Sequence, residues 1–379
     1  MILSLASSAV TAQTFSEFVA TLETAADSAR DPMIEEFLSH HTAPVIEGDS
    51  VHFLYRGTGK VVAVPGEMNR WNPSDAVMQR VARTDFFYRT YSFPLTSRVE
   101  YKIWVDSTWK LDSLNPRKAR GGYGENSDLW MPDYSSPSTS EFRPDIPRGT
   151  IDTIWFSSKH LNRRYPVLVY TPPGTKRRQR LPVVYVTDGG EYISLGKMNN
   201  VLDNLITEGR IRPVLGVFVD PRTDPRNAAT NERMTDYSAN TKFLDFLEKE
   251  LAPYIETKYP AARRADDRLI MGASMGGLIS TYAVLKRPQF FHNCAAQSPA
   301  YLMADSAVIQ LLKTKRTVKA NIYIDTGTIS DTQIEARRVK RMLQDKGARL
   351  IYAEYPEGHN WTNWRARLEN IFQYFFPPK

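Results

Sequence analysis

The chain has 379 residues, which is too long for one ordinary core and predicts two domains. With 42% hydrophobic and 24% charged residues it has the composition of a globular protein, and no apolar run reaches the roughly 20 residues of a membrane span. The formal net charge is +7, but the basic residues are scattered and no nucleic-acid-binding module accompanies them. We therefore expect a solvated basic surface and no nucleic-acid partner. A single cysteine, Cys294, excludes an internal disulfide and a cysteine-rich metal site.

Residues 1–12 are mostly apolar or small and end in Val10-Thr11-Ala12 before Gln13. Small residues at these positions are typical of the end of a secretory signal peptide, although the basic first region of such a signal is missing. The alternative is an N-terminal tail without a targeting role. A signal remnant predicts a periplasmic or secreted protein, and a plain tail predicts a cytoplasmic one.

Apolar residues recur at helical intervals in residues 13–42, which predicts one or two short helices. Residues 43–133 contain short runs rich in Val, Tyr, Phe and Trp, separated by polar or Gly/Pro/Asn-containing turns. Such runs are typical of an all-β sandwich. Residues 134–148 are rich in Ser and Pro and predict a linker between two domains.

Strands alternate with helical stretches in residues 149–379. Residues 183–186 and 214–219 are buried-strand runs, and residues 243–259 show the apolar face of an amphipathic helix. This alternation predicts an α/β fold with a mostly parallel central sheet that helices cover on both faces.

The strongest functional signal is the motif Gly272-Ala273-Ser274-Met275-Gly276-Gly277, between an apolar run and a helical stretch. Gly-x-Ser-x-Gly between a strand and a helix is the nucleophile elbow of α/β-hydrolases. The flanking residues are small because the tight turn leaves no room for side chains. The turn places the hydroxyl at a helix N-terminus, where backbone N–H groups can stabilise an oxyanion. The motif also occurs by chance as a glycine-rich turn, but this context favours Ser274 as a nucleophile.

A serine hydroxyl needs a base, and in this fold the acid and then the histidine follow the serine along the chain. Only two of the six histidines lie beyond Ser274. His292 comes just after the nucleophile helix, where a packed or surface imidazole is the simpler interpretation. His359 lies on a glycine-preceded loop beyond the last expected strand and is the predicted base.

The acid holds the imidazole in the required tautomer and stabilises the imidazolium. Asp325 ends an expected strand, and Asp331 lies in the following loop, just before a helix that it could also cap. The loop position favours Asp331 over Asp325. Glu354 and Glu357 are weaker candidates for the acid.

Two backbone N–H groups are predicted to form the oxyanion hole. Met275 follows the nucleophile directly, and Gly190 lies in Thr187-Asp188-Gly189-Gly190-Glu191 after an expected strand. Glycines there let the backbone approach a substrate. The alternative is a plain strand-end turn, with the second donor one residue away.

A series of motifs extends through residues 149–376 in a consistent order: Asp188-Gly189, residues 205–213, Asn231-Glu232-Arg233, residues 272–277, Gln297-Ser298-Pro299-Ala300, Gly358-His359-Asn360-Trp361 and Trp364-Arg365. With them this half resembles the esterase family that includes enterochelin esterases, esterase D, mycolyltransferases, and feruloyl and acetylxylan esterases. The resemblance places the acid in a Gly-x-x-x-Asp stretch, here residues 327–331. Relatives often have Glu-Leu after the arginine motif, where this chain has Asp236-Tyr237, and this departure weakens a substrate role for Arg233.

The β-rich half carries another set of motifs: residues 65–71, residues 101–106, Trp109 with Asp112, and residues 124–127. With them it resembles the immunoglobulin-like domains related to glycogen-binding modules. The resemblance implies that Trp71, Lys102, Trp109 and Asn126 touch glucan, since aromatic faces stack on pyranose rings. The alternative is that they hold the sandwich together or dock it on the hydrolase half. Such domains often accompany esterases without binding sugar.

These residues predict a two-step acyl transfer without a metal or an organic cofactor. His359 deprotonates Ser274, which attacks an ester carbonyl, while Gly190 and Met275 hold the oxyanion and Asp331 stabilises the imidazolium. Water then hydrolyses the acyl-enzyme. The sequence does not determine an oligomeric state.

Two small-molecule or polysaccharide ester substrates compete. One is an acyl or feruloyl ester of a plant polysaccharide, which the β-rich half favours slightly. The other is a cyclic catecholate siderophore lactone, and the basic balance would suit its anionic iron complex. An interpretation from another class is a non-catalytic carbohydrate-binding protein, and the intact order of serine, acid and histidine counts against it.

Overall fold

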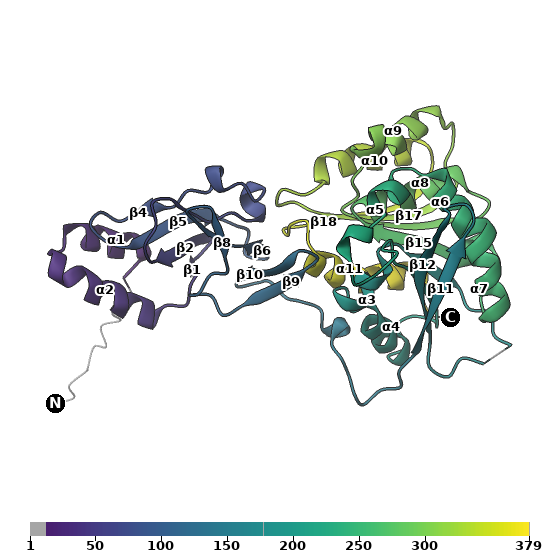
Figure 1. The fold of residues 1–379 in the computed structure, drawn as a ribbon, viewed down its shortest axis with the longest axis horizontal. Coiled ribbons are helices and arrows are strands. Elements are labelled where there is room, and N and C mark those ends of the chain that lie inside the picture. The colour runs from purple at the N-terminus through teal and green to yellow at the C-terminus, as the bar shows by residue number, and fades with distance from the viewer. Residues whose placement is uncertain (1–12, 177, 379) are drawn as a thin grey trace, which may run out of the picture. The chain divides into compact units, whose positions relative to one another are not determined.

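The computed structural model describes residues 13–176 and 178–378, so the predicted signal remnant in residues 1–12 lies outside the described residues. Contacts divide the chain into two compact units (Figure 1). Unit 1 comprises Met1–Ala119 and Glu125–Tyr134. Unit 2 comprises Arg120–Gly124 and Ser135–Lys379. The linker over residues 134–148 stays a prediction.

Unit 1 begins with the two helices α1 (Phe15–Thr24) and α2 (Asp27–His40). Thr14 and Glu17 form a capping box that satisfies backbone N–H groups at the start of α1. Phe18 of α1 stacks on Phe37 of α2, with ring centroids 4.0 Å apart. Both rings belong to an apolar cluster that includes residues of the neighbouring strands. The helical spacing in residues 13–42 therefore reflects a real buried face.

The rest of unit 1 is all-β. The strands up to residue 134 are β1 (Val45–Glu47), β2 (Ser50–Arg56), β3 (Val62–Ala63), β4 (Gln79–Arg80), β5 (Phe86–Ser92), β6 (Arg98–Tyr101), β7 (Ile103–Val105), β8 (Thr108–Lys110), β9 (Lys118–Gly121) and β10 (Gly124–Trp130). The segment Arg120–Gly124, which includes the end of β9 and the first residue of β10, belongs to unit 2. These strands form three small sheets in the orders β1-β2-β5-β4, β6-β10-β9 and β3-β7-β8. An all-β region precedes the α/β region as predicted, and its immunoglobulin-like type stays a prediction.

Unit 2 contains an eight-stranded sheet in the order β11-β12-β14-β13-β15-β16-β17-β18. The strands are β11 (Thr150–Ser158), β12 (Arg163–Thr171), β13 (Val183–Val186), β14 (Leu215–Val219), β15 (Arg268–Ala273), β16 (Asn293–Gln297), β17 (Asn321–Gly327) and β18 (Arg349–Tyr355). The β11–β12 and β12–β14 pairs are antiparallel, and the remaining pairs are parallel. This arrangement confirms the prediction of an α/β fold with a mostly parallel sheet.

The helices of unit 2 are α3 (Gly189–Ser194), α4 (Met198–Thr207), α5 (Arg233–Tyr237), α6 (Thr241–Asp245), α7 (Ala252–Lys258), α8 (Met275–Lys286), α9 (Met303–Thr314), α10 (Gln333–Asp345) and α11 (Trp361–Phe375). A π-helical segment, Phe246–Leu251, joins α6 to α7. The helix predicted for residues 243–259 is therefore a chain of three helical segments.

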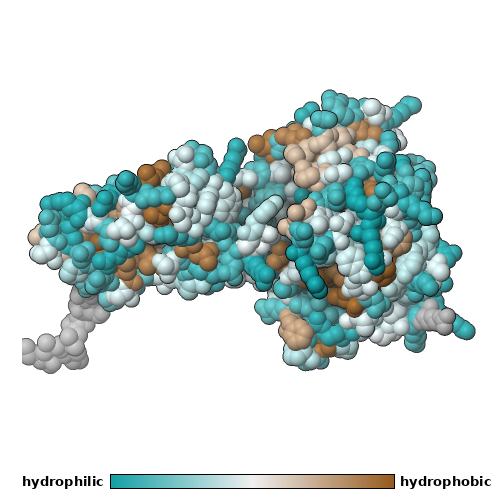
Figure 2. Space-filling model, in the orientation of Figure 1, coloured by the Kyte–Doolittle hydropathy of each residue, from teal (hydrophilic) through white to brown (hydrophobic). Residues whose placement is uncertain are grey.

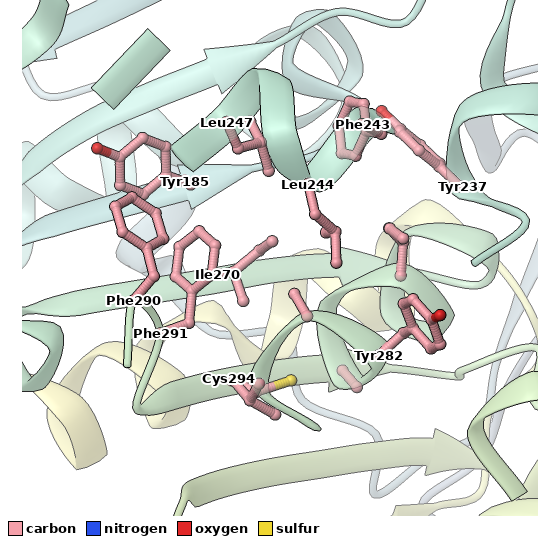
Figure 3. Close-up of a cluster of buried hydrophobic side chains, with 14 of the residues drawn as sticks. Tyr185, Tyr237, Phe243, Leu244, Leu247, Ile270, Tyr282, Phe290, Phe291 and Cys294 are labelled. Carbon is pink, nitrogen blue, oxygen red and sulfur yellow. The ribbon is translucent and has the colours of Figure 1, made fainter. Parts of the chain in front are cut away.

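Two apolar clusters cover the two faces of the sheet in unit 2. One contains residues of α5 to α10, and the other contains residues of α3, α4 and α11. Because successive side chains of a strand point to opposite faces, Ile270 belongs to the first cluster, and Leu269 and Met271 belong to the second. Figure 3 shows Ile270 in the first cluster together with Tyr185 and Phe291. Strand β15 is thus buried on both sides up to the residue that follows it, Ser274.

The described surface gives no sign of a membrane span. Within residues 13–176 and 178–378, no helix is long and apolar enough to cross a bilayer. Figure 2 shows a face covered mostly by hydrophilic residues, with hydrophobic residues in separate patches. A scattered pattern of this kind is normal for a protein surface.

The burial of β15 predicts a large cost for removing its side chains. Replacing Ile270, which is 0% exposed, with alanine is expected to lower the free energy of unfolding of unit 2 by about 2–5 kcal/mol, because it leaves a cavity in a packed core. Denaturant unfolding of wild type and variant measures this difference. Ile334→Ala is the control, since Ile334 on α10 is 67% exposed and its loss should change stability by less than about 0.5 kcal/mol. Equal effects of the two substitutions would contradict the assignment of this core.

Candidate active site

Ser274 is the single residue between β15 and α8, and its backbone is strained. Its φ is 58° and its ψ is −117°, a region that non-glycine residues rarely occupy and that is typical of functional sites. The neighbouring glycines make the turn possible. A Cβ on Gly272 would lie 1.9 Å from Thr187 Oγ1, and a Cβ on Gly276 would lie 2.3 Å from the same atom. The small residues of the motif therefore let the turn pack directly on the residue that follows β13.

Both backbone groups of Ser274 are anchored in the segment from the last residue of β16 to Ala300. Its N–H donates to the carbonyl oxygen of Gln297 at 2.8 Å, and its carbonyl accepts from the N–H of Ala300 at 3.0 Å. These two bonds hold the strained conformation in place. The motif Gln297-Ser298-Pro299-Ala300 thus supports the elbow.

The structure brings His359 and Asp331 together. His359 Nδ1 lies 2.7 Å from Asp331 Oδ1. The carboxylate is fully buried, whereas the imidazole side chain is 37% exposed. The ring of Trp364 meets the ring of His359 edge to face, with centroids 5.0 Å apart. Contacts with Asp331 and Trp364 therefore orient an imidazole that solvent can reach.

Asp331 accepts four hydrogen bonds. Besides His359, its donors are the N–H of Thr332 at 2.7 Å, the N–H of Gly327 at 2.6 Å and the hydroxyl of Ser298 at 2.6 Å. Burial raises the pKa of Asp331, but the hydrogen bonds from His359, Ser298 and Gly327 outweigh it and leave the pKa below its ordinary value. The carboxylate is therefore ionised at neutral pH, and the Nδ1 atom of His359 must be the donor between them.

Ser298 and Trp364 belong to the site although sequence reasoning gave them no role. Ser298 is fully buried with φ 39°, and its Oγ donates to Asp331 and accepts from Trp364 Nε1 at 2.9 Å. Trp364 in turn contacts His359. Both residues lie in motifs that carry the family resemblance, which was the signal that could have found them, but only the folded chain shows what they touch.

Asp325 takes a different place from Asp331. Its side chain is buried, and its Oδ2 accepts from Gln297 Nε2 at 3.3 Å. Its carbonyl accepts from the N–H of Ser298 at 2.7 Å. Asp325 is therefore hydrogen-bonded to Gln297 and Ser298 in the segment that anchors the elbow. Asp331, in contrast, is hydrogen-bonded to His359.

Glu354, Glu357 and His292 each form an ion pair with another partner than His359. Glu354 pairs with Arg337 and accepts from the hydroxyl of Tyr352, and Glu357 pairs with Arg367. His292 Nδ1 lies 2.6 Å from Asp266 in a pair that solvent reaches, which agrees with the interpretation of His292 as a surface imidazole.

The two predicted oxyanion donors lie at the starts of two helices. Gly190 is the second residue of α3 and Met275 is the first residue of α8. Among the residues that the structure describes, no oxygen accepts a hydrogen bond from either N–H group. A Cβ on Gly190 would lie 2.1 Å from Asp220 Oδ2, so a larger residue there would force the Asp220 side chain to move. N–H groups without an acceptor among the described residues are what an oxyanion hole requires.

The four residues of the predicted carbohydrate site lie in unit 1. The rings of Trp71 and Trp109 are tilted by 45° with centroids 6.5 Å apart, and Trp109 is 46% exposed. Asn126 Nδ2 donates to Glu100 Oε2 at 2.8 Å, and the backbone N–H of Lys102 donates to the carbonyl of Pro65. The structure thus brings the two tryptophans together, and contact with sugar stays a prediction.

The described residues contain no cluster of three or more His, Cys, Asp or Glu side chains that could hold a metal ion. Cys294 is buried, and burial raises the pKa of its thiol to about 12. A buried thiol with such a pKa does not serve as a nucleophile at neutral pH.

The chain is similar to proteins that are described as esterases. Residues 158–375 match the profile of the family described as "Putative esterase". An iron(III) enterobactin esterase of Escherichia coli O6:H1 is 27% identical over 331 residues, which cover 78% of this chain and 81% of that protein. An endo-1,4-beta-xylanase/feruloyl esterase of Xylanibacter ruminicola is 26% identical over 249 residues, which cover 62% of this chain and 32% of that protein. The crystal structure of a ferric enterobactin esterase from Salmonella typhimurium shares the fold, with a TM-score of 0.75 and 20% identity over 90% of this chain and 98% of that one.

The buried Asp325 predicts a pH-dependent contribution to stability. Burial raises its pKa to about 7, whereas an unfolded aspartate has a pKa of about 3.9. Ionisation therefore penalises the folded state, and stability falls as pH rises from about 4 to about 7 and levels off above that. Asp325→Asn cannot ionise, so its free energy of unfolding relative to wild type should increase by up to about 1.4 kcal/mol per pH unit in this range. Urea unfolding at pH 5 and pH 8 measures this change, and a constant difference would contradict the raised pKa.

Proposed function

Because the chain belongs to the Putative esterase family and is a carboxylic ester hydrolase, we propose that it reacts through an acyl-enzyme on Ser274, with His359 as base and Asp331 as the partner of His359. The observation that carries the proposal is the 2.7 Å contact between His359 Nδ1 and the buried Asp331. The hydroxyl of Ser298 binds the same carboxylate, and the preceding residue, Gln297, anchors the N–H of Ser274. The base and the nucleophile are thus fixed to one segment.

The protonation states follow from the hydrogen bonds. An ionised Asp331 requires the proton of neutral His359 on Nδ1, which leaves the Nε2 lone pair to accept the proton of the Ser274 hydroxyl. Ser274 Oγ then attacks the ester carbonyl, and the N–H groups of Gly190 and Met275 stabilise the oxyanion. His359 returns its proton to the departing alcohol. In the second half, His359 deprotonates water, which attacks the acyl-enzyme and releases the acid and Ser274.

For the substrate, we propose an ester of a catecholate siderophore as the first candidate. The match to the enterobactin esterase covers 78% of the chain, which is more than unit 2 holds, so it extends into unit 1. The match to the xylanase/feruloyl esterase covers 62%. Because the enterobactin esterase matches more of the chain, we rank the siderophore ester above the carbohydrate ester, which the sequence alone slightly favoured. A feruloyl or other acyl ester of a carbohydrate is the second candidate, supported by the exposed Trp109 beside Trp71.

Replacing Ser274 with alanine removes the proposed nucleophile. Wild type should hydrolyse at least one ester in a panel of a short p-nitrophenyl ester, methyl ferulate, acetylated xylan and a ferric catecholate trilactone. Ser274→Ala should lose kcat by roughly 10,000-fold or more, since covalent catalysis is abolished. A fluorophosphonate probe should label wild type and leave the variant unlabelled. Equal activity in both proteins, or no labelling of wild type, would sink the proposal and favour a non-catalytic role.

Two buried aspartates, Asp325 in β17 and Asp331 in the loop after it, allow a matched comparison. Asp331→Asn should lower kcat by roughly 10,000-fold, because an amide can donate to Nδ1 and stabilises the wrong tautomer of His359. Asp325→Asn changes a carboxylate that is bound to Gln297, not to His359, so its kcat should stay within about threefold of wild type. Steady-state kinetics at pH 8 separates the two, and a larger loss in the Asp325 variant would reassign the acid.

A further inference from the structure

One guanidinium bridges the two loops that carry the proposed oxyanion donors. Arg233, the first residue of α5, donates from Nε to Asp188 Oδ1 at 2.8 Å and from Nη2 to the carbonyl of Ala273 at 3.0 Å. Asp188 lies two residues before Gly190. Ala273 lies two residues before Met275. The Arg233 side chain is thus hydrogen-bonded to both loops at once.

Tyr237, at the other end of α5, completes the bridge. Its hydroxyl accepts the backbone N–H of Asp188 at 2.9 Å, and its ring lies under the Arg233 guanidinium, 5.7 Å from centroid to Cζ. Asp188 itself has φ 53° and ψ 39°, a left-handed conformation that needs support, and its carbonyl accepts the N–H groups of Glu191 and Tyr192. Arg233 and Tyr237 therefore hold the residue from which α3 starts.

Asp236, which precedes Tyr237 in α5, has other partners than Asp188. Asp236 accepts from the hydroxyl of Tyr165 at 2.6 Å and pairs with Arg163 at 3.3 Å. Arg163 also pairs with Glu232 at 2.8 Å. Relatives often have Glu-Leu where this chain has Asp236-Tyr237. Here Asp236 binds Arg163 and Tyr165, whereas Tyr237 supports Asp188.

Arg233 is poorly suited to attract an anionic substrate by charge alone. Its guanidinium is already paired with the buried carboxylate of Asp188, and its side chain is only 24% exposed. The pair is electrically neutral, so its main effect is geometric. An oxyanion hole depends on that geometry, because a misplaced donor loses most of its hydrogen bond to the transition state.

We propose that Arg233 is a positioning residue that sets the separation of the Gly190 and Met275 N–H groups, with Tyr237 as its support. The inference rests on the acyl-enzyme mechanism proposed above. Since the oxyanion exists only in the transition state, loosening the donors should lower kcat and leave KM nearly unchanged.

The test compares Arg233→Lys, Arg233→Met and Tyr237→Phe with the control Arg163→Lys. Arg163 is a matched control because its side chain is 26% exposed and forms its ion pairs with Glu232 and Asp236, whereas Arg233 pairs with Asp188. The substrates are neutral p-nitrophenyl acetate and an analogue with a free carboxylate, p-nitrophenyl hydrogen succinate. Fluorophosphonate titration of Ser274 normalises every rate to folded, competent enzyme.

Both Arg233 variants should lower kcat by roughly 10- to 100-fold on both esters, with KM changed by less than about threefold. Tyr237→Phe should act in the same direction and more weakly, and Arg163→Lys should stay within about threefold of wild type. The inhibition constant of a trifluoromethyl ketone, which forms a tetrahedral adduct, should rise in parallel with the loss of kcat. A merely structural role would reduce the titratable fraction and leave this constant unchanged.

Three results would overturn the inference. One is an unchanged kcat in all three variants, and another is a KM increase confined to the carboxylate ester, which would make Arg233 a substrate-binding residue. The third is a kcat loss without any change in the inhibition constant. If Arg233→Met does not fold, the lysine and phenylalanine variants decide. Failure of the underlying mechanism is seen separately, because Ser274→Ala would then remain active or wild type would remain unlabelled.

Discussion

The hydrogen bond from the N–H of Ser274 to the carbonyl of Gln297 connects the strained elbow to the rest of unit 2. The side chain of Gln297 is fully buried and extends this connection. Its Oε1 accepts from the hydroxyl of Tyr192 in α3, and its Nε2 donates to the carbonyl of Trp364 in α11, both at 2.9 Å. One residue thus joins the helix that follows the nucleophile, the helix that carries Gly190 and the helix that follows His359. Buried polar groups that are fully paired in this way fix a single arrangement.

The topology of the sheet explains why these segments meet. Strands β13, β15, β16, β17 and β18 are parallel neighbours, so their carboxyl ends lie along one edge. The residues that follow these ends include Asp188, Ser274, Ser298, Asp331 and His359. Ligand and catalytic groups of open α/β sheets gather at this edge. The apolar clusters on both faces hold the strands rigid, so each loop begins from a fixed point.

The features that could be predicted from the sequence are those that depend on residues close together in the chain. A glycine-flanked serine between a strand and a helix, and a histidine on a loop after a glycine, are visible as short motifs, and the alternation of strands and helices indicated the α/β fold. The roles of Ser298 and Trp364 depend on side chains that meet across 33 and 66 residues of chain. Arg233 reaches Asp188 across 45 residues. No local pattern encodes such contacts, because they arise only when the loops are brought to one edge. The division of unit 1 into three sheets was invisible for the same reason.

The charged side chains beside Gly190 are paired with one another. Arg222 pairs with Asp220 at 2.7 Å, and Arg233 pairs with Asp188 at 2.8 Å. Glu191 lies 4.0 Å from Arg222, and burial, followed by the charge of Asp188, raises its pKa. Since the guanidinium groups of Arg222 and Arg233 are both paired with carboxylates, the oxyanion would be stabilised by aligned N–H dipoles rather than by a free cation. Attraction of the anionic iron complex that we propose as the first candidate substrate would then rest on the long-range field of a chain with a net charge of +7. Such attraction would act on the rate of encounter and weaken with salt, whereas the chemical step would depend on the geometry of two backbone donors.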